Sequence, residues 1–167
     1  LLILLTLLIT GTTFAEEKDS KIYILDNNVY YDCPDGAMEA PSDLNIDIES
    51  VDIINDRFFK DKNFVYQVTS DWHSHFCYFT KIEEIDVESF EFLNNFFQKD
   101  KTNIYHSDFY WGWMTPRKKD LDVSTFQVLN DVYAKDSNGI YFAVNNKFGT
   151  VADADLETFE VLSEDES

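Results

Sequence analysis

The sequence predicts a mainly β protein with short helical turns, built as a tandem array of four units. Two linked motifs recur four times in register along the chain, which is the mark of a repeat architecture. The residues around the first motif are aromatic and β-branched and enclose turn-forming residues, as in a β-hairpin. One such unit is too small to bury its own apolar face, so we expect neighbouring units to stack.

The first residues predict export. Residues 1–9 read LLILLTLLI, an apolar run too short for a membrane-spanning helix, which needs about 20 residues. The run is typical of a signal-peptide core, and Thr13 and Ala15 supply small residues for cleavage before Glu16. We expect residues 1–15 to be a signal peptide, truncated because it lacks Met and a basic start, and the mature chain to be secreted or periplasmic. The alternative is a buried strand or helix.

The first motif is K-D-x-N-x-[VI]-Y, and it predicts strand, tight turn and strand. Asp favours turn geometry, and Asn138-Gly139 is the strongest hairpin signal in the chain. The motif is clean at residues 60–67 and 135–142 and degraded in the first copy. The copies occupy residues 24–31, 60–67, 99–106 and 135–142, and their tyrosines are Tyr30, Tyr66, Tyr105 and Tyr141.

The second motif is D-[VIL]-x-[ST]-[FV]-x-[VFI]-[LI], and it predicts a one-turn helix. Asp is a good N-cap, and Ser89 lies three residues after Asp86, where it can answer the cap. Phe90 and Leu93 are three residues apart, which places them on one face of a helical turn. The copies occupy residues 47–54, 86–93, 122–129 and 155–162, and they begin at Asp47, Asp86, Asp122 and Asp155.

Together the two motifs resemble the DKNYY repeat family of bacteria over residues 22–163. Thr102 stands where Asn is usual, Gln67 where a second Tyr is usual, and the first copy lacks the Lys-Asp pair. The resemblance implies an exported or envelope-associated repeat protein, with no activity, substrate or catalytic residue implied. We expect the motif Tyr and Phe residues to form a continuous core. The expected units are 22–55, 56–94, 95–130 and 131–163, followed by an acidic tail at 164–167.

The composition narrows the possible partners. The chain carries 32 acidic and 13 basic side chains, for a net charge of −19 and a pI of about 4.2. Nucleic-acid recognition and docking on anionic lipid both need clustered Lys and Arg, so we expect neither, and no stable membrane insertion of the mature chain. The sequence has no nucleophile elbow, Gly-rich phosphate loop or HExxH motif, so we expect no enzyme and no cofactor.

The two cysteines lie in corresponding inserts of neighbouring copies. Cys33 belongs to the insert of the first copy and Cys77 to that of the second. Because an exported chain meets an oxidising compartment, we expect a Cys33–Cys77 disulfide. The alternative is two separate buried thiols.

The second insert also carries a possible metal site. Asp71, His73, His75 and Cys77 alternate, so on a strand all four side chains would point to one face. His73 and His75 form a reasonable zinc pair, with Cys77 or Asp71 as a third ligand. This hypothesis and the disulfide exclude one another at Cys77, and hydrogen-bonded histidines are the simpler interpretation.

The inserts contain an aromatic set that is a candidate binding surface: Trp72, Tyr110, Trp111 and Trp113. Exposed, these side chains would stack on sugar rings or anchor a protein. The alternative is that they fill the core between thin repeats. The leading functional hypothesis is a non-enzymatic interaction module outside the cytoplasm that binds an unidentified protein or glycan. The second hypothesis is a metal- or ligand-binding protein built around His73, His75 and Cys77.

Overall fold

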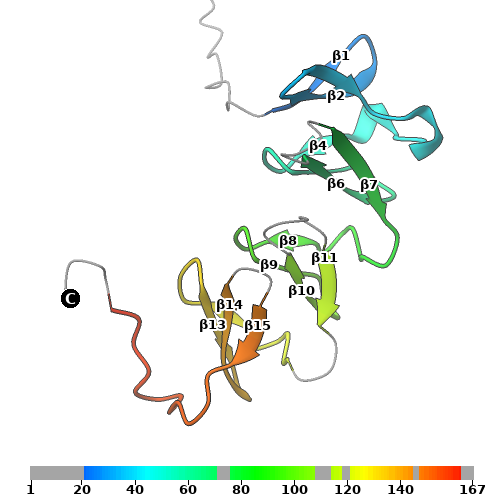
Figure 1. The fold of residues 1–167 in the computed structure, drawn as a ribbon. Helices are drawn as coiled ribbons and strands as arrows, with labels where there is room; N and C mark the ends of the chain where they lie inside the picture. Colours follow the sequence, from blue (N-terminus) through cyan, green and yellow to red (C-terminus); the bar gives the residue numbers. More distant parts are fainter. Residues whose placement is uncertain (1–20, 71–75, 108–113, 118–120, 145–146, 163–167) are drawn as a thin grey trace, which may run out of the picture.

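The computed structural model describes residues 21–70, 76–107, 114–117, 121–144 and 147–162. Four small antiparallel sheets follow one another along one direction in chain order (Figure 1). The predicted mainly β class is therefore confirmed. Helix is almost absent from the described ranges, which contain two short 3-10 turns, η1 (Ser42–Leu44) and η2 (Ile48–Ser50).

The strand order is a simple meander in every sheet. The first sheet contains β1 (Ile22–Leu25), β2 (Asn28–Cys33) and β3 (Gly36–Glu39). The second contains β4 (Asp52–Ile53), β5 (Phe58–Lys60), β6 (Val65–Ser70) and β7 (Cys77–Ile82). The third contains β8 (Glu91–Phe92), β9 (Phe97–Lys99), β10 (Ile104–Ser107) and β11 (Met114–Arg117). The fourth contains β12 (Gln127–Val128), β13 (Tyr133–Asp136), β14 (Gly139–Val144) and β15 (Lys147–Thr150).

Each first motif forms a hairpin, and a third strand follows it. The motif turn connects β5 to β6, β9 to β10 and β13 to β14, and β7, β11 and β15 pair with the second strand of each hairpin. The end of each of the first three second motifs forms a two-residue strand that joins the sheet of the following hairpin. The expected boundary between units at residues 55 and 56 thus falls inside the second sheet, between β4 and β5.

The predicted one-turn helix is reduced to a tight turn, and this is a correction. The first copy is the 3-10 turn η2, and the turns after Asp86, Asp122 and Asp155 are not assigned as helix. The chain enters a strand directly afterwards at Glu91, so no helical hydrogen-bond ladder can propagate. Phe90 and Leu93 therefore flank a short strand instead of sharing a helical face.

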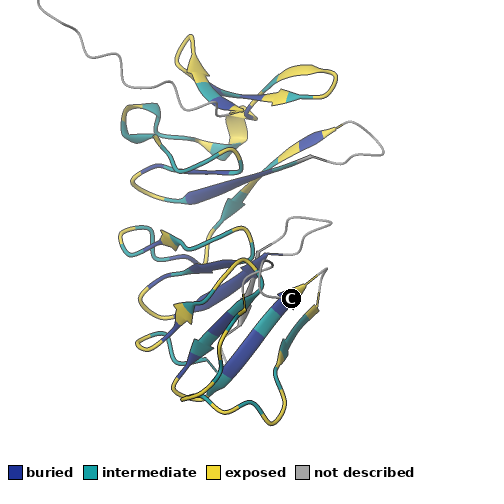
Figure 2. Cartoon of the chain, turned by 90° about the vertical axis from the view of Figure 1, so that its left-hand side faces the viewer, coloured by how far each residue is buried: buried dark blue, intermediate teal, exposed yellow. Residues whose placement is uncertain are grey.

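The core lies between successive sheets and is divided into three apolar clusters. Successive strand residues point to opposite faces, so each interior sheet serves two clusters. On β5, Phe59 joins the cluster shared with the first sheet, while Phe58 joins the cluster that contains Tyr105 of the third sheet. Figure 2 shows buried strand segments along the stack. Stacking of the sheets therefore supplies the burial that a single sheet lacks.

Candidate functional site

The turn of the second hairpin is built around the buried carboxylate of Asp61. Its Oδ1 accepts hydrogen bonds from the backbone N–H groups of Asn63 at 2.7 Å and Phe64 at 2.8 Å. Its Oδ2 accepts from the Tyr66 hydroxyl at 3.0 Å and from the backbone N–H of Asp47 at 2.8 Å. The residue is 2% exposed. One side chain thus joins the turn, the second hairpin strand and the preceding motif.

The same arrangement recurs in the third and fourth sheets, and we call it the carboxylate clasp. Its centres are Asp61, Asp100 and Asp136, all buried. Asp100 accepts from the Tyr105 hydroxyl at 2.6 Å and from the backbone N–H of Asp86 at 3.1 Å. Asp136 accepts from the Tyr141 hydroxyl and the backbone N–H of Asp122. The Asp and Tyr of the first motif are therefore partners.

The clasp hydrogen bonds lower the pKa of Asp61 and Asp100. Burial acts to raise the pKa of Asp61, but the hydrogen bonds from backbone N–H groups and Tyr66 outweigh it, and the pKa is lowered. At Asp100 the same opposition, with the Tyr105 hydroxyl as the strongest donor, lowers the pKa to about 2. Burial and the neighbouring carboxylate raise the pKa of both tyrosines. A carboxylate surrounded by hydrogen-bond donors is a weak base, so the clasp carboxylates are suited to holding the backbone in place and not to accepting protons.

The Ser or Thr of the second motif links its own turn to the turn of the following hairpin by hydrogen bonds. Ser89 donates its hydroxyl to Asp86 at 2.6 Å and accepts the backbone N–H of Lys101 at 3.0 Å. The Lys101 ammonium forms an ion pair with Asp86 at 2.6 Å. In the fourth sheet Ser137 replaces this lysine, and its hydroxyl donates to Asp122 at 2.8 Å. The predicted pairing of Asp86 with Ser89 is present.

A third repeated residue was missed by the sequence analysis. Asn94 accepts the backbone N–H groups of Phe96 at 2.9 Å and Phe97 at 2.8 Å through its Oδ1, so it caps the start of β9. Equivalent bonds start β5 and β13. The signal in the sequence is an Asn three residues before the aromatic residue that begins β5, β9 or β13, which is Phe58, Phe97 or Tyr133. The caps are Asn55, Asn94 and Asn130.

The first hairpin and the last copy of the second motif depart from this pattern. In the first hairpin Leu25 stands at the position of the clasp aspartates, and Asp26 and Asn27 adopt φ of 47° and 64° in a two-residue turn. Tyr30 is half-buried and donates its hydroxyl to Glu39 at 3.0 Å. At the other end Asp155 accepts the Thr158 hydroxyl at 3.0 Å. The motif tyrosines therefore enter the core in the last three copies and not in the first.

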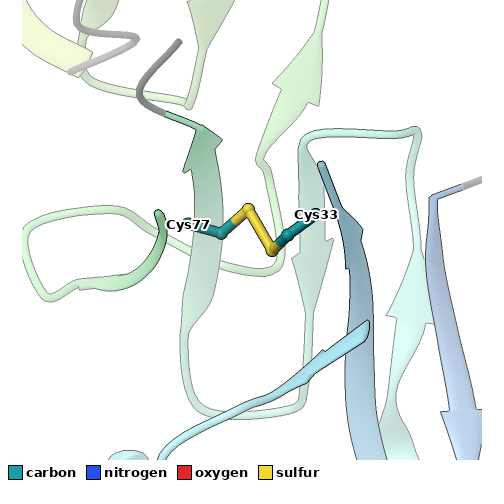
Figure 3. The surroundings of a disulfide bond; sticks show 2 residues. All are labelled: Cys33 and Cys77. Carbon is teal, nitrogen blue, oxygen red and sulfur yellow. A yellow bond between two sulfur atoms is a disulfide. The ribbon is translucent and has the colours of Figure 1, made fainter. Parts of the chain in front are cut away.

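A disulfide joins the first two sheets. Cys33 at the end of β2 and Cys77 at the start of β7 are bonded, with their Cα atoms 6.1 Å apart (Figure 3). The alternative of two separate thiols is wrong. A bonded sulfur has no thiolate to offer, so Cys77 is not a zinc ligand as hypothesised. Asp71, His73 and His75 lie outside the described residues, and the described ranges contain no group of three potential metal ligands.

Aromatic side chains are exposed beside the disulfide. Phe76 is 64% exposed and Tyr78 is 53% exposed, one on either side of Cys77. Phe76 belongs to the insert that contains Trp72, and Tyr78 follows that insert on β7. The sequence-predicted aromatic set, Trp72, Tyr110, Trp111 and Trp113, lies outside the described residues. The alternation of β7, which turns Tyr78 away from buried Cys77, was the available signal for Tyr78.

The described part of the chain contains no helix that is both long and apolar enough to cross a membrane. Its site features are the three clasps, the disulfide and the exposed aromatic pair. They define a stacked β-sheet protein whose repeated polar residues serve the fold. The chain belongs to the DKNYY family, whose model matches residues 23–167. No curated protein and no solved structure matches it.

Proposed function

We propose that this chain is an exported, non-enzymatic binding module that works outside the cytoplasm, in a secreted or periplasmic setting. The observation that carries the proposal is the Cys33–Cys77 disulfide between the first and second sheets. Disulfides persist in oxidising compartments and are rare in the cytosol. The apolar run at residues 1–9 supports the same route, with residues 1–15 as a signal peptide.

The scaffold of this module is a tandem array of four units. The equivalent clasps at Asp61, Asp100 and Asp136 support three of them, and the hairpin order of the first sheet supports a fourth. The buried carboxylates of the clasps accept hydrogen bonds from backbone N–H groups. Their chemistry thus supports a scaffold role over catalysis.

The binding surface is centred on Phe76 and Tyr78 and extends to Trp72. Exposed aromatic side chains offer flat apolar area that stacks on sugar rings or enters a pocket of a protein partner. Their neighbour Cys77 is 5% exposed and covalently anchored, so Tyr78 on β7 and Phe76 just before it flank a fixed residue. Tyr110, Trp111 and Trp113 form a second candidate surface on the next insert.

The proposal is tested by measuring the melting temperature of the exported chain with soluble glucan, chitin oligosaccharides and peptidoglycan fragments, and by pull-down with immobilised chain. A ligand at 100 times its dissociation constant adds about 2.7 kcal/mol, which is a visible shift. We expect Phe76→Ser with Tyr78→Ser to abolish the shift or the capture. Val144→Ser, which changes an apolar residue 38% exposed on the fourth sheet, is the control.

Two outcomes would overturn it. Equal loss of binding in the Val144→Ser control would show that the aromatic pair is not the surface. A thermal shift with zinc, reversed by a chelator, would favour the rival metal site on His73 and His75, now without Cys77.

A further inference from the structure

Each of the last three sheets is completed by a short strand from the preceding motif. In the second sheet β4 pairs with β5, with Asp52 opposite Lys60 and Ile53 opposite Phe59. The third and fourth sheets receive β8 and β12 in the same way. The chain therefore uses one mode of joining three times.

The C-terminal end carries a further copy of the second motif, and the described residues include no later sheet with which its end would pair. Residues 155–162 repeat the second motif, and Glu160 and Val161 correspond to the two residues of β4, β8 and β12. No strand is assigned at these residues in the described part of the chain. Phe159 contacts Tyr133 with ring centroids 5.7 Å apart, yet both are half-buried, whereas their counterparts Phe126 and Phe97 are buried. Leu162 is 67% exposed.

The N-terminal end has the matching deficiency. The first sheet has three strands, and β1 holds the position of β5 without a described counterpart of β4. Its register places Ile24 opposite Val29 and Tyr23 opposite Tyr30, as Lys60 lies opposite Val65 and Phe59 opposite Tyr66. The sequence before β1 offers charged Glu17 and Lys18 where Ile53 and Ile54 precede β5.

The outward face of the first sheet also matches an interior face. The rings of Tyr23 and Tyr30 stack with centroids 5.7 Å apart and planes inclined by 16°. Phe59 and Tyr66 stack likewise at 4.7 Å and 9°, and both are 0% exposed in the core shared with the first sheet. Tyr23 and Tyr30 are half-buried. This aromatic pair is thus the kind that another unit covers inside the chain.

We propose that two copies of this chain associate head to tail through these two ends. Glu160 and Val161 of one copy add a short antiparallel strand to β1 of the next, with Glu160 opposite Ile24 and Val161 opposite Tyr23. The tyrosine pair then packs over Tyr133 and Phe159. A second copy is the occupant because its two ends reproduce the interface that the chain already forms three times internally. The contact is heterologous, so it continues from copy to copy.

Charge sets the conditions for this association. Copies with a net charge of −19 repel one another, and salt screens that repulsion over about 10 Å at 0.1 M. Added salt therefore strengthens the association. The inference uses the repeat array of the proposed function and not its partner, so binding of that partner is measured separately on a monomeric variant.

The test measures the mass of the exported chain by sedimentation against protein and salt concentration. The tail is blocked by Val161→Pro, because proline removes a backbone donor and disfavours strand pairing. The head is blocked by Tyr23→Ser with Tyr30→Ser. We expect the original chain to form oligomers of increasing size, each blocked variant alone to stay monomeric, and an equal mixture of the two variants to form a dimer and nothing larger. Circular dichroism melting checks that both variants fold.

A cysteine cross-link tests the register independently of those variants. Glu160→Cys in one copy and Ile24→Cys in the other are expected to form an intermolecular disulfide, while Glu160→Cys with Ala37→Cys, at the far edge of the first sheet, is not. An original chain that stays monomeric at high concentration and salt would overturn the proposal. Oligomers that persist in the blocked variants, or cross-linking equal in both pairs, would do so too.

Discussion

At the residue scale, each clasp aspartate joins its own turn to a strand tyrosine and to the preceding motif. Asp100 accepts backbone or hydroxyl donors from its own turn, from Tyr105 and from Asp86 fourteen residues earlier. The sequence predicts the turn role because Asp is a local turn former. The bond to Asp86 was not predictable, since it links two motifs that sequence reasoning treats as separate elements.

Removing the charge of one clasp is expected to destabilise the fold strongly. In Asp100→Asn the amide group turns a donor toward donors, which leaves buried N–H or hydroxyl groups unpaired at about 1–3 kcal/mol each. We expect a loss of about 3 kcal/mol in the free energy of unfolding, measured by urea denaturation. Asp26→Asn is the control, because Asp26 is also a turn aspartate of a hairpin but lies one position after the clasp position and is exposed. Equal losses in the two variants would contradict the clasp.

The clasps also predict acid sensitivity. The folded pKa of Asp61 and Asp100 lies below the ordinary value of 3.8, so their stabilisation is present above about pH 4. It is lost as the pH falls through the folded pKa, which for Asp100 is a window from about 4 to about 2. Urea midpoints measured across this range are expected to fall with pH. A flatter profile is expected in Asp100→Asn, and an unchanged slope would argue against the linkage.

At the element scale, the fold depends on strands too short to be seen from sequence. β4, β8 and β12 have two residues each, and the helical spacing of Phe90 and Leu93 indicated a turn of helix there. The hairpin strands were predictable because alternating aromatic and β-branched residues flank clear turn signals. The short segments become strands because they pair with the hairpin that follows, and local sequence does not show that pairing.

The hydroxyl of the second motif is expected to matter more than the neighbouring lysine. Ser89→Ala removes bonds to both Asp86 and the Lys101 backbone, and we expect a loss of about 1 kcal/mol. Lys101→Ala removes the exposed ion pair with Asp86. Exposed ion pairs contribute at most about 1 kcal/mol to stability and often much less. Thermal melts at low and high salt compare the two variants. A larger loss for Lys101→Ala would contradict this ranking.

At the scale of the whole molecule, each sheet depends for its burial on the sheets next to it. Each cluster is shared by neighbouring sheets, and the disulfide joins the first two. The sequence analysis indicated a four-part array and paired the two cysteines from their corresponding positions. It placed the candidate binding aromatics in the inserts, and of the described exposed pair Phe76 lies near the end of the second insert while Tyr78 lies on β7.

Loss of the disulfide is expected to weaken the N-terminal half selectively. A cross-link closing a loop of 44 residues contributes about 4 kcal/mol in the chain-entropy model. Cys33→Ser with Cys77→Ser is therefore expected to raise hydrogen exchange in the first and second sheets. Exchange in the fourth sheet, which lies beyond the third, is expected to stay unchanged. A uniform rise would contradict this dependence of each sheet on its neighbours.

Deleting residues 131–167 is expected to leave a folded, less stable remainder. The cut removes one side of the last cluster and exposes Phe97 and Phe126, while the clusters between the first three sheets persist. Circular dichroism and limited proteolysis report the outcome. A fully unfolded product would show that the sheets form one indivisible core.

The disulfide also has a mechanical consequence. When the chain is pulled from its two ends, tension passes from β2 through the Cys33–Cys77 bond directly into β7. The enclosed segment, which contains β4, β5 and β6, bears no load. At about 3.5 Å per residue, its 44-residue span withholds about 150 Å of extension. The strands outside the closed loop, which are β1, β2, β7 and those of the third and fourth sheets, stay under load, so the molecule extends there while the enclosed segment keeps its length.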